Sequence, residues 1–287
     1  MAKTREEYFK NAQVLIEALP YIQCFTNKLV VIKYGGSAMT DPAVKQKVIQ
    51  DIVLMKLVGI IPVVVHGGGK EISVLLDRLG IESHFEDGLR VTDAETAQVA
   101  QMVLAGKINK EIVAMFQREG ADAVGICGHD ARTFIVEKHM PGGKDIGFVG
   151  NITGVADGLI STLTTGGFLP VIAPVGTDEE GNSYNINADF AAAAVATALK
   201  AEKLIFLSDV EGVYGRSKDE FFSRIKKEDI EGMIGEGVIT GGMIPKLNCC
   251  KESLEGGVHS VHIIDGRVPH SLLLEVFTDY GIGTMIE

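Results

Sequence analysis

Two glycine-rich segments follow short runs of β-branched apolar residues, and glycines in such positions are suited to binding an anion. The first segment, KYGGS (33–37), contains Gly35 and Gly36, and the second, HGGGK (66–70), contains Gly68 and Gly69. Because glycine has no Cβ, its backbone can approach an anion closely, and free N–H groups converge where strands end and helices begin. The glycines could instead serve only to form tight turns. Two such segments, each after an apolar run, favour an anion site.

Three cations accompany these segments. Lys33 ends the first apolar run, where a lysine either snorkels at a sheet edge or points at a ligand, and the adjacent glycines favour the ligand. Lys246 follows a double glycine and enters a helix, and its own segment fits an ordinary exposed helical lysine slightly better. Arg90, in GLRVT, is either half of a surface ion pair or a bidentate clamp for a carboxylate.

Polar side chains precede an alanine-rich helix in NINADFAAAA (185–194). Asn185, Asn187 and Asp189 alternate, so in an extended chain they share one face and suit polar recognition. Asp189 also fits a simple N-terminal helix charge. In SDVEGVY (208–214), Ser208 and Asp209 end a strand, and Asp209 is equally suited to a ribose or magnesium-shell contact and to capping a turn.

Several familiar site motifs are missing from the sequence. It has no Walker A loop, no GxGxxG fingerprint, and neither the HRD nor the DFG motif of protein kinases. His66 has no serine or cysteine partner in sequence, which favours a structural hydrogen bond over a catalytic base. The adjacent Cys249 and Cys250 fall in an expected helix and are interpreted as core residues.

Alternating strand and helix patterns position these residues. We expect short glycine-flanked strands at 123–126, 133–136 and 148–153 to form hairpins beside the main sheet. The alternation predicts a mostly parallel sheet covered by helices, and the polar passage 177–185 is the expected boundary between two lobes. The remaining expected elements are strands at 29–33, 60–65, 168–176, 203–209 and 258–265, and helices at 43–58, 70–79, 94–119 (broken near Gly106), 190–199, 227–235 and 246–256.

The first segment has helical periodicity over 5–19, with apolar residues on one face. Thr4 and Glu7 are spaced as a capping box, and Pro20 is expected to end the helix. An apolar stripe on a helix outside the main body marks either an interface or a face that folds back on its own subunit. The sequence leaves these two open.

Composition excludes some classes of function. The chain has 287 residues and a net charge of -11, so it lacks the positive charge of a nucleic-acid binder. An anionic small substrate needs only a few local cations. The apolar stretches are too short to cross a membrane, and no signal peptide is expected. The four cysteines lack metal-ligand spacing and predict reduced thiols in a cytoplasmic compartment.

Taken in order, six motifs resemble the acetylglutamate kinase branch of the amino-acid kinase family: VIKYGGSAM, VVVHGGGKEI, GLRVTD, NINADFAAAAVA, LSDVEGVY and ITGGMIPKL. The resemblance runs from about Leu29 to the C-terminus. It implies an α/β fold, an open three-layer αβα sandwich with a mostly parallel central sheet, two lobes and a protruding N-terminal helix. The implied regions are an oligomerisation helix (1–27), an N-lobe for acetylglutamate binding and dimerisation (28–178) and a C-lobe for ATP binding and arginine regulation (179–287).

The implied activity is ATP-dependent phosphorylation of the γ-carboxylate of N-acetyl-L-glutamate, an early step of arginine biosynthesis. Lys33 and Lys246 match the lysines that stabilise the transferring phosphoryl group, and Asp189 matches the carboxylate that organises them. ATP with Mg2+ is the implied co-substrate, with no tightly bound cofactor and no resident metal. The matched substrate residues are Gly68, Gly69, Arg90 and Asn185, and the matched nucleotide or phosphate residues are Gly35, Gly36, Ser208 and Asp209.

The initial helix and the segment HIIDGRVPHSLLLEVFTDYGIGTMI further resemble the arginine-sensitive, hexameric branch. This likeness implies arginine as a feedback effector, a homo-hexamer built as a trimer of dimers, and an effector site at Tyr8, His262, Glu275 and Gly281. It leaves open whether a PII signalling protein is a partner. Carbamate, aspartate, glutamate and uridylate kinases share the glycine turns, and a non-catalytic sensor of an acidic metabolite is the rival from another class.

Overall fold

The computed structural model describes residues 5–39, 41–86, 88–217 and 219–287, without the side chains of residues 6–8, 10, 11 and 37. The expected capping box at Thr4 therefore lies outside the described residues. Within them, no helix is both long enough and apolar enough to cross a membrane.

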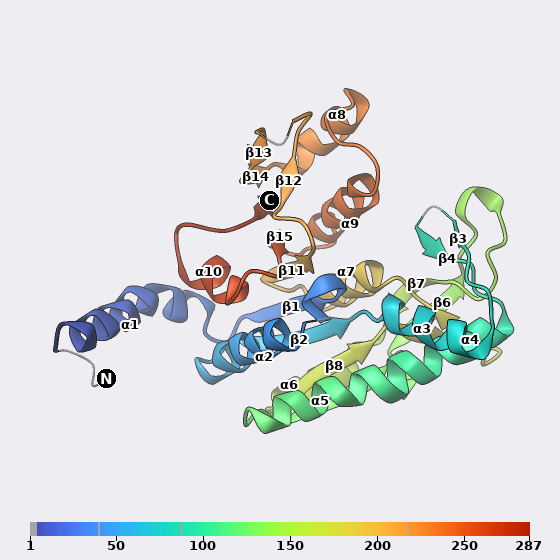
Figure 1. Ribbon diagram of the computed structural model, residues 1–287, viewed down its shortest axis with the longest axis horizontal. Coiled ribbons are helices and arrows are strands. Elements are labelled where there is room, and N and C mark those ends of the chain that lie inside the picture. The colour runs from blue at the N-terminus through green and yellow to red at the C-terminus, as the bar shows by residue number, and fades with distance from the viewer. Residues whose placement is uncertain (1–4, 40, 87, 218) are drawn as a thin grey trace.

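An eight-stranded sheet forms the centre of the molecule, in the order β14-β16-β15-β11-β1-β2-β8-β5 (Figure 1). Every neighbouring pair is parallel except β15 and β16. The predicted mostly parallel α/β sheet is therefore confirmed. The strands are β1 (Leu29–Tyr34), β2 (Ile61–His66), β5 (Ala123–Cys127), β8 (Leu169–Ala173), β11 (Lys203–Ser208), β14 (Arg224–Ile225), β15 (Ser260–Asp265) and β16 (Thr284–Ile286).

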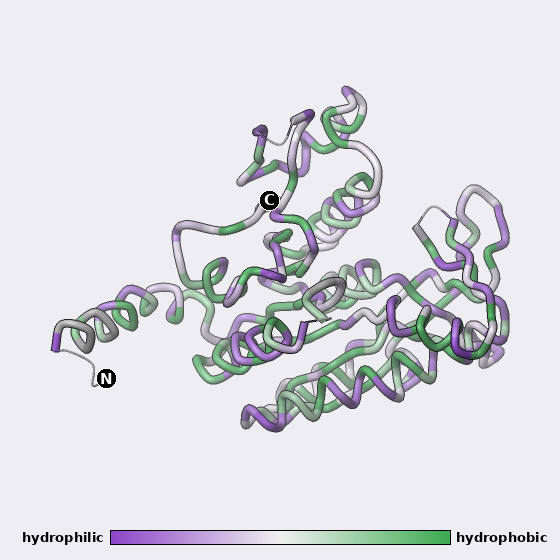
Figure 2. The backbone as a smooth tube through the Cα atoms, in the orientation of Figure 1, coloured by the Kyte–Doolittle hydropathy of each residue, from purple (hydrophilic) through white to green (hydrophobic). Residues whose placement is uncertain are grey.

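Helices cover both faces of this sheet and give three layers. Successive residues of β1 point to opposite faces, so Val30 and Ile32 belong to one core and Val31 to the other. Figure 2 shows the apolar strands enclosed between the helical layers. One core includes residues of α2 (Pro42–Leu57), α3 (Gly69–Leu79), α5 (Asn109–Arg118) and α10 (Ser271–Phe277), and the other includes residues of α6 (Gly158–Thr165), α7 (Ala188–Ala198), α8 (Ile230–Gly235) and α9 (Met243–Glu255).

Smaller sheets lie beside the main one. A four-stranded sheet has the order β10-β9-β6-β7, and two short hairpins pair β3 with β4 and β12 with β13. The expected boundary between residues 178 and 179 falls in the turn that joins the paired strands β9 and β10; the division into lobes stays a prediction. These strands are β3 (Phe85–Glu86), β4 (Leu89–Arg90), β6 (Phe134–Lys138), β7 (Gly150–Val155), β9 (Val175–Thr177), β10 (Ser183–Asn185), β12 (Val213–Tyr214) and β13 (Phe221–Phe222).

Two details of the strand prediction are wrong. The strand at 123–127 is no part of a hairpin, because it pairs in parallel with β8 at the edge of the main sheet. The apolar run 168–176 is not a single strand, since Pro174 separates β8 from β9 and the two belong to different sheets. Proline has no N–H to donate to a strand ladder, so Pro174 fits a break between strands, although Pro62 and Pro170 lie inside strands of the main sheet.

The long helix expected at 94–119 is interrupted as predicted. It consists of α4 (Ala94–Gln101), a π-helical segment η2 (Met102–Ile108) that contains Gly106, and α5. Single-turn π segments often occur at functional sites. The short 3-10 segments are η1 (Gly36–Met39), η3 (Asp130–Arg132), η4 (Pro141–Gly143) and η5 (Lys227–Asp229).

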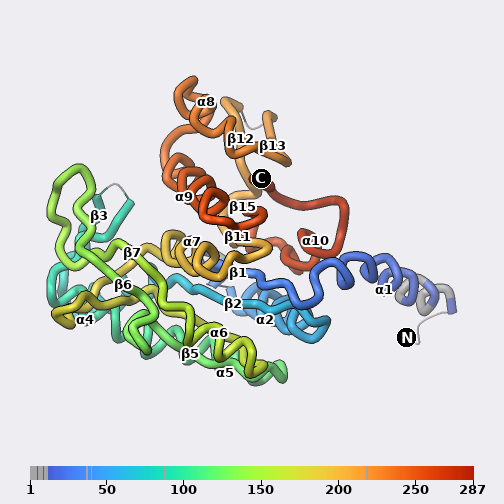
Figure 3. Tube along the Cα trace, turned by 180° about the vertical axis from the view of Figure 1, so that it is seen from behind, coloured from blue at the N-terminus to red at the C-terminus, as the bar shows by residue number. Residues whose placement is uncertain are grey.

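The N-terminal helix α1 (Arg5–Phe25) projects from the body, as Figures 1 and 3 show from opposite sides. Pro20 lies inside this helix instead of ending it. Proline removes one N–H donor, but the following turns are held by contacts with the body, including a hydrogen bond from Tyr21 Oη to Asp279 Oδ1 at 2.5 Å. Leu15 and Ile16 are 71% and 63% exposed, so the apolar stripe does not fold back onto this subunit.

Candidate functional site

Two lysines from distant parts of the chain meet on one carboxylate. Lys33 Nζ, at the end of β1, lies 3.0 Å from Asp189 Oδ1, and Lys246 Nζ, in α9, lies 2.5 Å from Asp189 Oδ2. Asp189 itself is in the first turn of α7. Strand order and helix packing therefore bring together the three residues predicted to act on the transferring phosphoryl group.

Electrostatics keep this carboxylate ionised. Burial alone would raise the pKa of Asp189, but the charges of Lys33 and Lys246 and their hydrogen bonds outweigh burial and bring it to about 2. The Lys246 ammonium also lies 5.0 Å from the centre of the Phe206 ring, within range of a cation–π contact. One negative and two positive charges leave a net positive charge at this point, which favours a bound anion.

The glycines at the end of β1 make room for Lys33. A Cβ on Gly35 would lie 2.7 Å from Lys33 Nζ, so a side chain at this position would displace the ammonium. Gly36 has a φ of +63°, a conformation that favours glycine. Gly35 thus shapes the lysine's position, and Gly36 lines the cavity beside it.

Two helices begin at this cavity. The HGGGK segment places Gly68 at the N-cap of α3 and Gly69 at its first position. At the start of α7, Asn187 Oδ1 accepts hydrogen bonds from the N–H groups of Asp189 and Phe190 at 2.8 and 3.4 Å. The predicted extended alternation therefore ends at Asn187, because Asp189 is already helical, yet Asn185, Asn187 and Asp189 all line the cavity.

Arg90 reaches the same cavity from β4. It is only 6% exposed, and its Nη2 donates to the Gly69 carbonyl and to Ser73 Oγ, both at 2.8 Å, while Nη1 donates to Ser83 Oγ. The guanidinium lies 4.6 Å from the centre of the Phe85 ring. No ion pair joins it to a carboxylate in the described part of the chain, so the carboxylate-clamp interpretation is favoured over the surface ion pair.

The resulting cavity has a volume of about 260 Å³. The predicted residues that line it are Lys33, Gly36, Gly68, Gly69, Arg90, Asn185 and Asp189. Charged side chains from β1, β4 and α7 line this cavity, and Ile72, Leu104 and Val149 supply apolar parts of its wall. This arrangement suits a small dianion whose two negative groups are separated by an apolar stretch.

A second cavity, of about 540 Å³, lies in the C-terminal half beside β12. Ser208 and Asp209 do not line either of these two cavities; Ser208 is buried at the end of β11 and Asp209 is exposed. The sequence analysis did not predict the residues that line the second cavity, although several of them belong to the motif LSDVEGVY. They include Val210, Glu211, Tyr214, Arg216, Met243 and Arg267.

Comparison with known proteins decides the family. A model of the amino acid kinase family matches residues 28–265. The chain belongs to the amino acid kinase family. Its relatives include an acetylglutamate kinase from Heliobacterium modesticaldum, 56% identical over 96% of this chain and 98% of the relative. As a member of this family, the protein is a kinase, with ATP as a substrate.

Solved structures of the amino acid kinase fold include an N-acetylglutamate synthase from Neisseria gonorrhoeae complexed with coenzyme A and N-acetyl-glutamate. It matches 96% of this chain at 26% identity with a TM-score of 0.85. The same synthase complexed with coenzyme A and L-arginine matches at 25% identity with a TM-score of 0.81. This chain spans 63% and 65% of those two synthase chains.

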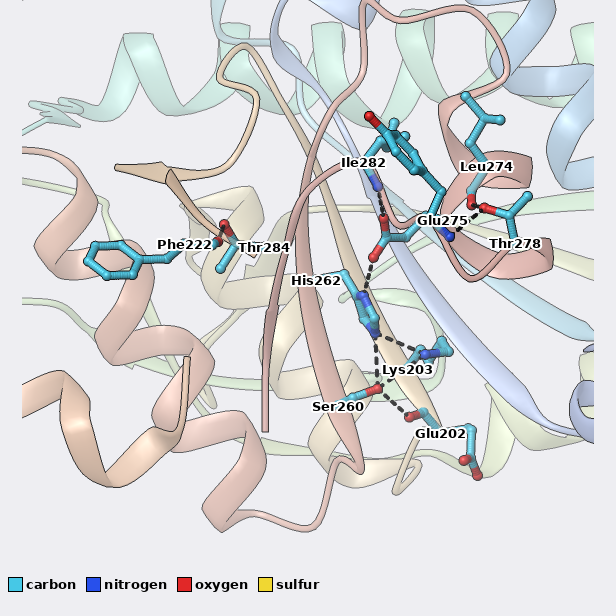
Figure 4. Close-up of polar contacts among 11 residues, drawn as sticks. Glu202, Lys203, Phe222, Ser260, His262, Leu274, Glu275, Thr278, Ile282 and Thr284 are labelled. Carbon is cyan, nitrogen blue, oxygen red and sulfur yellow. Dashed lines mark hydrogen bonds and ion pairs between the residues drawn. The ribbon is translucent and has the colours of Figure 1, made fainter. Parts of the chain in front are cut away.

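In this amino acid kinase, the predicted effector residues His262 and Glu275 lie side by side (Figure 4). His262 Nδ1 lies 2.6 Å from Glu275 Oε1, and the Ile282 N–H donates to Glu275 Oε2 at 2.8 Å. Gly281, with a φ of +48°, lies against Glu275 Oε2. The side chain of Tyr8 lies outside the described residues.

The cluster around His262 and Glu275 also contains residues that the sequence did not point to. Lys203 Nζ, on β11, lies 2.9 Å from His262 Nε2 and 5.0 Å from the centre of the Phe25 ring at the end of α1. Burial lowers the pKa of Lys203, while the nearby Glu275 carboxylate raises it in part. The cluster therefore joins β11, β15, α10 and the end of α1 through polar contacts.

The remaining interpretations concern buried polar residues of the kinase. His66 is fully buried, burial lowers its pKa to about 4, and its ring is hydrogen-bonded on both sides, which fits the structural role expected for it. Cys249 and Cys250 are buried in α9, and burial raises the pKa of both thiols, so they are core residues as expected. All four cysteines are free thiols.

Proposed function

We propose that this protein transfers the γ-phosphoryl group of ATP to the side-chain carboxylate of N-acetyl-L-glutamate, in arginine biosynthesis. The observation that carries the proposal is the pair of lysines on Asp189, beside a cavity that Lys33, Asp189 and Arg90 line. The relatives that are acetylglutamate kinases at 53–56% identity support the same substrate.

The geometry suits an acceptor that needs no general base. A carboxylate with an ordinary pKa near 4 is already ionised at neutral pH, so the site must instead overcome the repulsion between two anions. Lys33 and Lys246 supply positive charge on the transferring group, and Asp189 holds both ammonium groups in place. Positioning and charge stabilisation then provide most of the rate enhancement.

The other groups of the cavity orient the acceptor. Arg90 offers its positive charge to the α-carboxylate because, among the described residues, its hydrogen bonds go to neutral oxygens and leave that charge unpaired. Both N–H groups of Nη2 already donate, to the Gly69 carbonyl and to Ser73 Oγ, so a bidentate contact with the carboxylate would replace one of these bonds. The N-terminal end of α3, with Gly68 and Gly69, faces the cavity with a helix dipole that favours an anion. Asn185, at the end of β10, supplies an amide for the acetamido group.

ATP would occupy the second cavity, with its phosphates directed towards Gly36 and the lysines. Mg2+ would enter as part of the MgATP substrate, because the phosphates of ATP bind it. Arg216 and Arg267 place positive charge at the wall of this cavity. Ser208 and Asp209 would then act at its edge.

Arginine is the proposed effector, and the cluster of Lys203, His262 and Glu275 is the proposed site. A buried carboxylate such as Glu275 suits a guanidinium, and a structural relative is described in complex with L-arginine. The exposed apolar stripe of α1 supports a homo-hexamer in which this helix joins dimers. A PII protein as a further partner has no support from any residue described above.

One assay tests the proposed function. ADP release is measured with N-acetyl-L-glutamate, and compared with glutamate, aspartate and carbamate as acceptors. We expect activity with acetylglutamate alone, and a fall in kcat of about 100- to 1000-fold in Lys33→Ala and in Lys246→Ala with a smaller change in KM. Comparable activity with another acceptor would contradict the substrate, and a near-normal kcat in either variant would contradict the role of that lysine.

A further inference from the structure

A one-directional chain of hydrogen bonds leads from the surface of α5 to the glycine loop of the cavity. Lys110 Nζ donates to Asn109 Oδ1 at 3.1 Å, and Asn109 Nδ2 lies 3.2 Å from His66 Nε2. His66 Nδ1 lies 2.8 Å from the carbonyl oxygen of Gly67. Asn109 is 1% exposed and His66 is fully buried, so water does not compete for these groups.

The partners of each group fix the protons along this chain. A carbonyl oxygen only accepts, so His66 Nδ1 must carry a proton to bond to Gly67. Asn109 Nδ2 is identified as the amide nitrogen because it also lies 2.9 Å from the Val171 carbonyl, while Oδ1 faces the Lys110 ammonium. His66 Nε2 is then a lone-pair acceptor, and the ring is neutral.

The direction of the Gly67 carbonyl determines where the next N–H points. The peptide between Gly67 and Gly68 is trans, so its C=O and N–H point in opposite directions. With the carbonyl held towards His66, the N–H of Gly68 points away from the ring, and Gly68 lines the cavity. Among the described residues this N–H has no protein acceptor, which leaves it free for a ligand.

The π-helical segment η2 supports the same loop from behind. A Cβ on Gly68 would lie 2.3 Å from Ile108 Cδ1 and 2.7 Å from Leu104 Cδ2, so the loop packs directly against η2. Asn109 is the residue that follows η2. The extra residue in the π turn thus sets both the packing surface under Gly68 and the place from which Asn109 reaches His66.

We propose that Asn109 is a positioning residue of the substrate site. By donating to His66 Nε2 it selects the imidazole tautomer whose Nδ1–H holds the Gly67 carbonyl, and so directs the Gly68 N–H at the anionic acceptor. This inference rests on the proposed function for its acceptor, N-acetyl-L-glutamate. The hydrogen bonds among Asn109, His66 and Gly67, and the tautomer of His66 that they require, do not depend on which substrate binds.

The wild-type protein provides the first test, without any substitution. In 15N-labelled protein, the imidazole nitrogens of His66 are observed by NMR between about pH 6 and pH 8.5. We expect a neutral ring protonated at Nδ1 throughout. A ring protonated at Nε2 would overturn the proposal, whether or not the protein phosphorylates acetylglutamate.

Asn109→Asp gives the second test, because it keeps the size of the side chain and replaces the donor with an acceptor. At high pH the neutral His66 ring must move its proton to Nε2 to meet the introduced carboxylate, which frees the Gly67 carbonyl. At low pH the ring becomes doubly protonated and can hold both partners. We expect KM for acetylglutamate to rise about tenfold near pH 8.5 and to return to within about threefold of wild type near pH 6, with KM for ATP unchanged.

The wild-type protein contains the same other titrating groups around His66 as the Asn109→Asp variant. Its pH profile, measured in parallel, therefore shows their effect. Burial raises the pKa of Asp51 to about 6 and that of Tyr34 above its usual range, and the lysines hold that of Asp189 at about 2. The charged and titratable groups on neighbouring elements include Lys33 and Tyr34 on β1, Asp51 on α2, Lys110 on α5 and Asp189 on α7.

A matched control separates positioning from a general loosening of α5. Ile112→Val removes a buried methyl group from the same helix, and should lower the melting temperature with no pH-dependent change in KM. Asn109→Leu, which cannot be rescued by protonation, should keep a raised KM at every pH. A KM of Asn109→Asp that is the same at pH 6 and pH 8.5 in a folded protein would refute the proposal.

Discussion

Asp189→Asn tests whether one carboxylate organises both lysines. In the wild-type protein its two oxygens contact Lys33 and Lys246 at 3.0 and 2.5 Å. Asparagine keeps the shape and removes the charge. The two ammonium nitrogens, at most about 8 Å apart, would then repel by about 2 kcal/mol at an effective dielectric constant of about 20.

The pKa of Asp189 gives a second measure of the same interaction. The difference between its folded value of about 2 and its ordinary value of 3.8 corresponds to about 2.5 kcal/mol of stability at neutral pH. Because the folded pKa is the lower one, this contribution is present above about pH 4 and is lost as the pH falls towards about 2. The pKa shift therefore sets the expected loss in the variant at about 2–3 kcal/mol, and the repulsion between the lysines, present in both proteins, is no longer offset by the carboxylate.

We therefore expect Asp189→Asn to lower the melting temperature by about 5–8 °C at pH 7. The difference from wild type should shrink when the pH is lowered from 4 towards 2. Because the ammonium groups lose their common anchor, kcat should fall about 100-fold. Calorimetry and steady-state ADP release measure the two effects.

Asp178→Asn is the matched control for this prediction. Asp178 also accepts several hydrogen bonds, from Asn182 and Tyr184, but it contacts neither lysine. This control should lose stability and keep its kcat. A folded Asp189→Asn protein with kcat within about threefold of wild type would show that the carboxylate does not organise the lysines.

Two further predictions concern the acceptor and the N-terminal helix. Arg90→Lys should raise KM for acetylglutamate about tenfold with a smaller effect on kcat, because the planar fork is lost; steady-state kinetics that showed only a change in KM for ATP would remove Arg90 from the acceptor site. Deletion of residues 1–25 should give active dimers with weakened or non-cooperative inhibition by arginine, because it removes the exposed apolar stripe of α1; light scattering that still showed hexamers, together with a full sigmoidal arginine response, would refute the role of this helix.

The sequence predicted the fold well because its signals are local. Alternation of apolar strands and helices fixes a mostly parallel sheet, and the sheet then carries Lys33, Gly36 and Gly68 to neighbouring strand ends. The errors arose where local signals are ambiguous. Flanking glycines do not distinguish an edge strand such as β5 from a hairpin, and Pro20 interrupts only one hydrogen bond in a helix whose later turns are held by the body.

The parts of the site that the sequence did not show depend on contacts between distant segments. Asn109 looks like any polar residue in a helix until the fold places it beside His66, 43 residues earlier. Lys203 resembles a solvated strand-end lysine until β15 brings His262 within 2.9 Å. The role predicted for Ser208 and Asp209 stays a prediction: their motif runs into the second cavity, but its walls come from the residues that follow.

The acidic composition and the cationic cavity are compatible because charge acts locally in salt solution. The chain carries a net charge of -11. Around the cavity, however, the described residues place three cations, Lys33, Lys246 and Arg90, and one carboxylate, Asp189. Lys33, Arg90 and Asp189 line the cavity, and Lys246 contacts Asp189. At physiological ionic strength, exposed charges more than about 8 Å apart are largely screened from one another, so the surface carboxylates do little to repel an anion inside the cavity. Buried charges are screened much less. The overall charge therefore argues against binding of nucleic acid, because that ligand needs an extended cationic surface. It does not prevent two small anions from binding next to Asp189, Lys33 and Lys246.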